Sequence, residues 1–281
     1  LTHLLQCGRQ NTVSCSPNAS RTAELLGACC TGPENRNHVQ EEVSMLPEPL
    51  ENATVGEIVA ADYRTARVFE ARGIDFCCGG KIPLATVCAR HGLNMEQILH
   101  ELEAVQREPG ARKEQYGSWS LSSLADYIVR THHGYLTKND EPIAASARKI
   151  ATVHGVNHPE VIEIAALFAK IATDMTAHLK EEEDIFFPAI KRAETARTSG
   201  RQPEAKDQET IRASLAKLYR EHEEIGEAVH AIRHLARDYA IPGDACTTFV
   251  VTYQKLKEFE DDLHKHVHLE NNILFPKAAD L

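Results

Sequence analysis

Hydrophobic residues recur every three or four positions through most of the chain after residue 120, which is the spacing of one buried helix face. The pattern predicts four long helices, and Asp244 is the expected N-cap of the last one. They span about 121–154 (with a continuation after Pro142), 159–196, 209–239 and 244–279. Because no segment shows the alternation of a strand, we expect an all-α fold in which these helices form an antiparallel four-helix bundle.

A smaller helical module is predicted ahead of the bundle, at residues 51–108. Thr54 and Glu57 have the spacing of a capping box at the start of its first helix. Gly73 and Gly92 are expected to end two further helices, since glycine readily adopts the left-handed conformation that often follows a helix. The later helices of the module are expected at about 64–72, 84–91 and, capped by Asn94, up to about 107.

The segments outside these two units are polar. Residues 1–50 are rich in Asn, Ser, Thr, Gly and Pro, and we predict a disordered N-terminal extension. The first methionine is Met45, and one hypothesis is that the native start lies near it, so that residues 1–44 are an upstream extension. Residues 108–118 are expected to link the small module to the bundle, which we place at 118–281.

Composition excludes several classes of protein. The formal net charge of −10 argues against nucleic acid as the main partner, because phosphate binding needs clustered Lys and Arg. No apolar run has the length of a membrane span, and no apolar segment of signal-peptide type begins the chain. We therefore expect a cytoplasmic protein that does not bind membranes, with its eight cysteines reduced.

Two segments of the predicted bundle are near copies of each other. Residues 178–188 (HLKEEEDIFFP) and 266–276 (HVHLENNILFP) both fit the pattern His-x-x-x-Glu-x-x-Ile-x-Phe-Pro. A histidine lies upstream of each copy: His133 precedes the first by 45 residues and His222 precedes the second by 44. The bundle therefore reads as two halves, each of which supplies one His and one His-x-x-x-Glu pair.

The helical period places these polar residues on the buried faces. In the second helix an unbroken stripe steps by three and four residues through Ile164, Phe168, Ile171, Met175, His178, Glu182, Ile185 and Ala189. His222, His266 and Glu270 occupy equivalent positions in the third and fourth helices. In the first helix the helical period does not distinguish whether His132 or His133 faces the core. A buried glutamate is costly unless something compensates its charge, and a metal ion does so.

The spacing also suits metal chemistry. Four residues of helix turn about 400° and rise about 6 Å, so a His and the Glu that follows it point the same way from adjacent turns. The imidazole can bind one metal while the carboxylate bridges to a second. Six such ligands are too many for a tetrahedral zinc site but suit two metals, and mixed imidazole and carboxylate donors favour iron over manganese or zinc. Six further histidines of the bundle are expected on the surface: His154, His158, His230, His234, His264 and His268.

Cys77 and Cys78 are adjacent in the segment DFCCGG and are followed by two glycines. Adjacent cysteines rarely form a disulfide, because the small ring strains the bond geometry. The pair is therefore either buried and inert or an accessible thiol site, and the residues alone leave both readings open. Cys88 and Cys246 are expected to be structural.

The six candidate ligands, the Phe-Pro endings and the DFCCGG segment together resemble the iron–sulfur cluster repair di-iron proteins, also called the repair-of-iron-centres family. That family combines a hemerythrin-like bundle with a short cysteine-containing domain. In its first ligand motif, which THHGYL resembles, the second His is the ligand, so the resemblance implies His133. It also favours a thiol site at Cys77 and Cys78. Oxygen-carrying hemerythrins place a further His where this chain has Gly226, which implies more open metal positions here.

The resemblance implies a non-haem di-iron centre that repairs iron–sulfur clusters damaged by nitrosative or oxidative stress, by donating iron. Its partners would be damaged iron–sulfur proteins, with nitric oxide or dioxygen as small ligands and a homodimer as one option. A non-enzymatic iron donor is the main reading. The alternatives are an oxidoreductase that binds or converts nitric oxide, and a gas-sensing or iron-storage module.

Overall fold

The computed structural model describes residues 46, 47, 49–108 and 115–281, all of which belong to one compact unit. The described residues form helices and no strand, so the predicted all-α fold is confirmed. The proposed extension at 1–50 lies mostly outside the described residues, although Leu46 and Leu50 at its end are buried. None of the described helices combines the length and the apolar character needed to cross a membrane.

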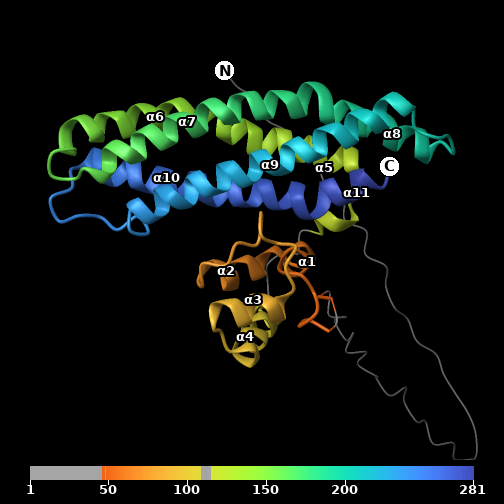
Figure 1. Ribbon diagram of the computed structural model, residues 1–281, viewed down its shortest axis with the longest axis horizontal. Helices are drawn as coiled ribbons and strands as arrows, with labels where there is room; N and C mark the ends of the chain where they lie inside the picture. The colour runs from red at the N-terminus through yellow and green to blue at the C-terminus, as the bar shows by residue number, and fades with distance from the viewer. Residues whose placement is uncertain (1–45, 48, 109–114) are drawn as a thin grey trace, which may run out of the picture. The chain divides into compact units, whose positions relative to one another are not determined.

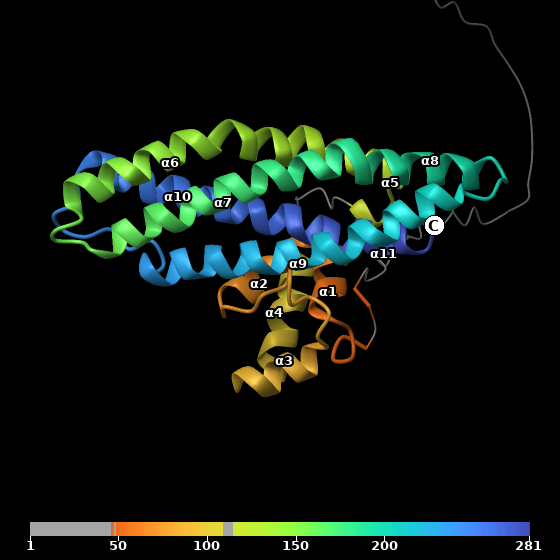
Figure 2. The same cartoon turned by 45° about the horizontal axis from the view of Figure 1, so that its top comes forward.

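Four rods of helix lie side by side in the bundle (Figures 1 and 2). Three of them are interrupted by a short π-helical segment, and α9 is continuous. The first rod is α5 (Leu121–Ile128), Val129–His133 and α6 (Gly134–His154); the second is α7 (Glu160–Glu181), Glu182–Phe186 and α8 (Phe187–Thr198). The third is α9 (Ala205–Leu235), and the fourth is α10 (Thr247–Leu269), Glu270–Leu274 and α11 (Phe275–Ala279). α6 packs on α7 and α10, and α7 packs on α9.

The small module contains α1 (Val55–Ala61), α2 (Ala66–Glu70), α3 (Leu84–His91) and α4 (Met95–Arg107). The capping box is confirmed, because the Glu57 N–H donates to Thr54 Oγ1 and the Thr54 N–H donates to the Glu57 carboxylate. α3 ends at Gly92, whose φ of 63° is left-handed, and Asn94 caps α4 through the N–H of Gln97. Buried side chains of the module and of the bundle belong to one hydrophobic cluster.

Three bundle helices differ from the predicted ones, two at an end and one at an expected interruption. α9 stops at Leu235 because Arg237, Asp238 and Tyr239 all have positive φ, which cannot continue a right-handed helix. α10 is capped by Cys246 and not by Asp244, whose carboxylate lies 3.0 Å from His158 Nε2 instead. α6 runs through Pro142 without a break; this residue is exposed, so water can reach the carbonyl that its missing N–H leaves free.

The π-helical segments shift the hydrophobic register. The predicted stripe of the second helix is wrong at Ile185, which is 48% exposed, while Phe186 is buried. In both repeats the segment starts at the glutamate, and the N–H of the following Phe (Phe187 or Phe275) donates to that glutamate's carbonyl five residues back. The next residue is Pro, which has no N–H to restore the ordinary α-helical bond. Each copy of the repeat therefore inserts one extra residue into its turn.

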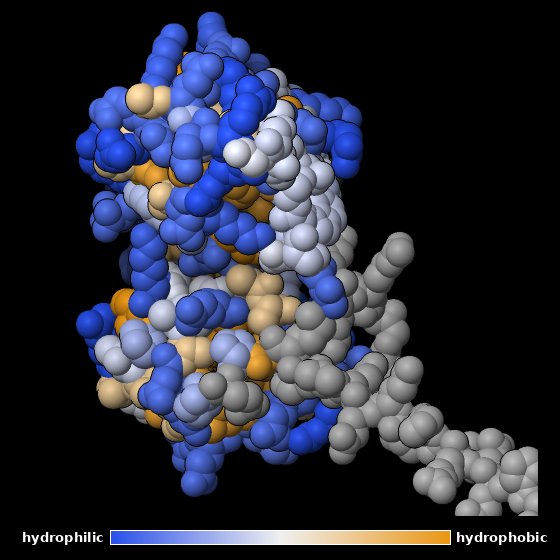
Figure 3. Space-filling model, turned by 90° about the vertical axis from the view of Figure 1, so that its right-hand side faces the viewer, coloured by the Kyte–Doolittle hydropathy of each residue, from blue (hydrophilic) through white to orange (hydrophobic). Residues whose placement is uncertain are grey.

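The interior of the bundle is apolar on both sides of the polar residues. One hydrophobic cluster fills the end formed by α5, α8 and α11, and a second runs along the rest of the bundle. Phe168 and Phe259 meet edge to face in the second cluster, with ring centroids 5.0 Å apart. Hydrophilic side chains cover most of the surface that faces the viewer in Figure 3. Because the two hydrophobic clusters lie on either side of them, the polar residues inside the bundle are enclosed by hydrocarbon.

Candidate metal site

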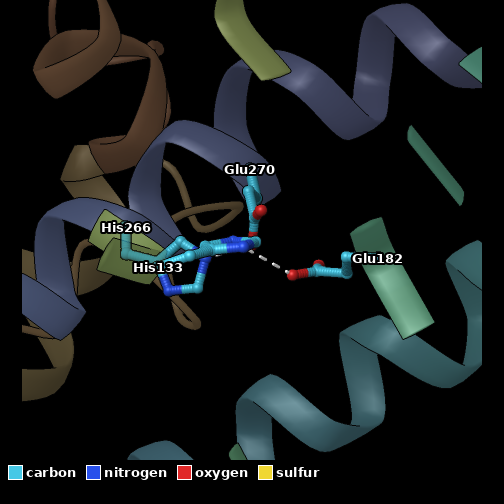
Figure 4. Close-up of side chains that lie close together, drawn as sticks. All are labelled: His133, Glu182, His266 and Glu270. Atoms are coloured by element: carbon cyan, nitrogen blue, oxygen red, sulfur yellow. Dashed lines mark ion pairs between the residues drawn. The ribbon is translucent and has the colours of Figure 1, made fainter. Parts of the chain in front are cut away.

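The structure brings six of the predicted residues together inside the bundle. They form two groups of four buried residues, and the two groups share Glu182 and Glu270. His133 and His266 complete one group, and His178 and His222 complete the other. Within each group the candidate ligand atoms all lie within 4.8 Å of one another. Figure 4 shows the side chains of the first group converging from different rods of the bundle.

Each glutamate lies between two imidazoles, and every imidazole presents Nε2 to a carboxylate. Glu182 lies 3.5 Å from His133 Nε2 and, through its other oxygen, 3.5 Å from His178 Nε2. Glu270 Oε2 lies 3.3 Å from His222 Nε2 and 3.1 Å from His266 Nε2. Two carboxylates placed between two pairs of imidazoles form the geometry expected for ligands that share metal ions.

The atoms at this centre are fully buried and poorly satisfied. Both carboxylate oxygens of Glu182 and of Glu270 lack a hydrogen-bond partner, as do the Nε2 atoms of His133 and His266. An unpaired buried polar group costs roughly 1–3 kcal/mol, and an unpaired charge costs more. A cation at the centre would satisfy all of these atoms at once, and the donor set suits a first-row metal. The residues present therefore fit a metal-binding centre.

The pKa values at the centre also favour cation binding. Burial and the nearby charge of Glu270 raise the pKa of Glu182 well above its usual range. Burial opposes ionisation of Glu270 as well, and only positive charge on the imidazoles of His266 and His222 would hold its pKa below the usual range. Burial lowers the pKa of His266 to about 3, so this imidazole stays neutral, as a metal ligand must. A metal ion would allow both carboxylates to ionise together.

The Nδ1 atoms of three of the imidazoles form hydrogen bonds with residues that the sequence pattern did not mark as part of the site. His133 Nδ1 lies 2.8 Å from Glu183, His178 Nδ1 lies 2.9 Å from Glu221, and His222 Nδ1 lies 2.8 Å from Asn271. Such partners fix the ring orientation and the tautomer, and so leave Nε2 free for a metal. The three residues share a signal in the sequence, because each is the immediate neighbour of a candidate ligand.

Position favours His133 over His132 as the candidate ligand. His133 ends the π-helical segment and faces Glu182, whereas His132 Nδ1 pairs with Asp262 Oδ1 at 3.0 Å. Two other histidines were placed wrongly on the surface: His264 and His268 are both buried. They lie on the side of α10 that the small module covers, since both rings pack against Phe76. The spacing of hydrophobic residues in the bundle helices does not reveal that the small module covers this face of α10.

The two adjacent thiols lie close to the metal-binding centre. The Cys78 thiol donates to the backbone carbonyl of His222 at 3.4 Å, and the Asn271 amide donates to the carbonyl of Cys77. Gly226 makes room for this contact, because a Cβ there would lie only 3.2 Å from Cys78 Sγ. Cys78 also lines a cavity of about 490 Å³. The neighbouring thiol and burial together raise the pKa of Cys77 well above its usual range.

Cys246, expected to be structural, is exposed at the N-terminus of α10, and its thiol lies 3.1 Å from His154 Nε2. Backbone N–H donation from Phe249, together with His154, lowers the pKa of this thiol to about 7.

We expect Cys246 to be alkylated by iodoacetamide faster than Cys77, Cys78 or Cys88, with a half-maximal rate near pH 7, because the thiolate is the reacting form. Peptide mass spectrometry after short pulses measures this. His154→Ala should move the midpoint upward, and equal rates at Cys246 and buried Cys88 would contradict the assignment.

A helical bundle whose interior holds clustered histidines and shared carboxylates defines the chain as a bundle metalloprotein. The model of the hemerythrin HHE cation-binding domain matches residues 124–278, and the chain belongs to this family. A domain of unknown function (DUF542) matches residues 51–106. The two matches agree with the resemblance identified from the sequence.

Curated relatives match most of the chain. An iron–sulfur cluster repair protein ScdA of Staphylococcus epidermidis is 29% identical over 223 residues, which are 79% of this chain and 96% of the relative. An iron–sulfur cluster repair protein YtfE of Yersinia pestis is 29% identical over 227 residues, 81% of this chain and 96% of the relative. A YtfE protein of Yersinia pseudotuberculosis matches to the same extent.

Proposed function

We propose that this protein holds a di-iron centre and repairs damaged iron–sulfur clusters by donating iron. The observation that carries the proposal is the pair of buried ligand groups that share Glu182 and Glu270. The relatives that match along nearly their whole length are named iron–sulfur cluster repair proteins. The family match adds a cation-binding domain over the same helices.

In the proposed centre, Glu182 and Glu270 would bridge two irons and the four histidines would be terminal ligands. His133 and His266 would bind one iron, and His178 and His222 the other, following the two groups. Imidazole and carboxylate donors are hard enough for ferrous and ferric iron, whereas the thiolates typical of structural zinc are absent from the two groups. Each iron would keep open positions, because two imidazoles and two bridging carboxylates supply only four ligands.

Open positions and shared carboxylates suit an iron that must leave. A metal ion that is fully enclosed by protein donors exchanges slowly, whereas an open position lets an incoming ligand compete. The chain lacks the additional imidazole of the oxygen-carrying hemerythrins, since Gly226 and the Cys78 thiol lie there instead. Small ligands such as nitric oxide or dioxygen could enter the same open positions.

The thiols of the small module at 51–108 would exchange iron with the bundle at 118–281. Cys77 and Cys78 line two cavities next to α9 and contact the backbone of His222 or the side chain of Asn271. We propose that they form a thiol site that receives or hands over iron. The four described cysteines are free, and unpaired thiols are typical of a reducing compartment such as the cytoplasm.

A reconstitution assay tests the repair role. A [4Fe–4S] enzyme inactivated by nitric oxide is mixed anaerobically with iron-loaded protein, a thiol reductant and a sulfide source. We expect its activity to return several times faster than with an equal amount of free ferrous iron. Protein carrying Glu182→Ala and Glu270→Ala should give no more recovery than buffer. If free iron restores activity as fast as the loaded protein, iron donation is not the function.

A further inference from the structure

A second cluster of potential metal ligands lies away from the six-residue centre. His230 comes from α9, and Glu260 and His264 come from adjacent turns of α10. One ligand atom from each of the three residues lies within 4.8 Å of the other two. None of them belongs to the two groups that share Glu182 and Glu270. Two imidazoles and one carboxylate are the donor set of mononuclear ferrous sites with open coordination positions.

The buried imidazole of His264, which has no hydrogen-bond partner, is the central observation. The residue is only 8% exposed, yet neither ring nitrogen has a hydrogen-bond partner. The ring lines a cavity of about 470 Å³ and lies 5.8 Å, centroid to centroid, from the ring of His230. A neutral imidazole buried without a partner loses the hydrogen bonds that it makes in water, which destabilises the folded state. A ligand in the cavity that accepts an imidazole lone pair removes this cost.

Glu260 is held in place for such a role. Its carboxylate is fully buried and accepts bonds from Arg233 Nε and from the Tyr239 hydroxyl, both at 2.7 Å. One carboxylate oxygen lies 3.8 Å from His264 Nε2, a separation that a single metal ion can bridge. Each oxygen keeps a lone pair beyond the bond that it accepts. Arg233 and Tyr239 thus orient the carboxylate in the way that outer partners orient a metal ligand.

The charge around the cavity favours a cation in spite of Arg233. The lining carries the carboxylates of Glu70, Asp75 and Asp238, against the guanidinium groups of Arg233 and Arg237. The buried Glu260 carboxylate, bonded to Arg233, adds a fourth acidic group beside it. Acidic groups therefore outnumber the arginines, and a divalent cation would balance the remaining negative charge.

Strained backbone beside the cavity supports the same reading. Just beyond the end of α9, φ is 51° at Arg237, 55° at Asp238 and 60° at Tyr239, a left-handed conformation that is unfavourable for residues other than glycine. This turn brings the Tyr239 hydroxyl onto Glu260. Strain of this kind persists where the surrounding structure imposes it, and it often marks a binding site.

We propose that His230, Glu260 and His264 form a third metal site, which binds a single divalent first-row ion such as ferrous iron, separately from the di-iron centre. The site opens to the 470 Å³ cavity, whereas Glu182 and Glu270 are fully enclosed. Water fills the coordination positions that the three residues leave open. The site exchanges its ion faster than the di-iron centre, because it has fewer protein ligands.

Cobalt(II) titration tests the site in the full chain. The di-iron centre is first disabled by Glu182→Ala and Glu270→Ala, so the outcome does not depend on the proposed repair role. Anaerobic addition of Co²⁺ is followed by visible absorption and by metal analysis after gel filtration. We expect one bound equivalent per chain. Adding His230→Ala, a change at an exposed position, should weaken Co²⁺ binding at least tenfold.

His234→Ala is the matched control. His234 is also exposed on α9 and lines the same cavity, but it is not part of the cluster. This variant should bind Co²⁺ as the parent does. His264→Ala should abolish binding, with circular dichroism confirming that the helices persist. The proposal is overturned if the parent takes up no Co²⁺, or if His230→Ala and His234→Ala bind it equally well.

Discussion

Replacing Glu182 and Glu270 by Ala is expected to remove nearly all iron from the purified protein. Each carboxylate lies between two imidazoles, so its loss takes a ligand from both proposed iron positions at once. Loss of a shared ligand should weaken iron at least a hundredfold, since removal of an outer partner alone typically costs 10–100-fold. Iron is measured by elemental analysis of protein purified without oxygen.

Substitutions at the same two positions also separate a metal site from a structural role. Without metal, the two buried carboxylates lack hydrogen-bond partners and oppose folding. The isosteric pair Glu182→Gln and Glu270→Gln should therefore leave metal-free protein at least as stable to heat as the wild type. Glu224→Ala is the control, because this carboxylate is exposed on α9 and paired with Arg220. If the Ala variant keeps its iron, or if Glu224→Ala loses iron equally, the assignment of the two bridging residues is wrong.

Asn271→Ala is expected to have the second largest effect, a 10–100-fold faster loss of iron to a chelator. The Asn271 side chain meets His222 Nδ1 at 2.8 Å and also donates to the carbonyl of Cys77. Without it the imidazole of His222 can rotate, and the loop that carries the two thiols loses a contact. Stopped-flow chelation of the loaded protein by a ferrous chelator measures the rate.

The neighbouring residue offers a matched control. Asn272 also lies in the segment Glu270–Leu274 and bonds to the carbonyls of Phe76 and Cys77, but its amide meets His268 and not a proposed ligand. Asn272→Ala should therefore loosen the loop while iron leaves at nearly the wild-type rate. Equal acceleration by both substitutions would mean that loop packing, and not the orientation of His222, controls release.

The sequence was sufficient to predict the helices and the six inward-facing residues, because repeat and periodicity agreed at His178, Glu182, His266 and Glu270. It failed within the turn that follows Glu182, whereas Ile273, in the turn after Glu270, is buried as predicted. An α-helical period places Ile185 inside, but the π-helical segment inserts a residue and buries Phe186 instead. Such an insertion depends on which backbone bonds form around Pro188, and hydrophobic spacing does not encode that choice.

Other features depend on contacts between distant segments. His264 and His268 look exposed when the bundle is considered alone, and they are buried because Phe76 of the small module packs against them. Glu183, Glu221 and Asn271 become recognisable only when the opposing imidazole is placed. Periodicity within one helix cannot reveal these pairings, although the positions beside each ligand were the places to look.

Mössbauer spectroscopy of ⁵⁷Fe-loaded protein, combined with an iron count on the same anaerobic sample, tests the central proposal most directly. Two irons held between Glu182 and Glu270 should give two tightly bound ions per chain. After oxidation, they should give a spin-coupled diferric pair with a diamagnetic ground state. One tightly bound iron per chain or none, or two ions that behave as isolated high-spin centres, would contradict the shared-carboxylate centre.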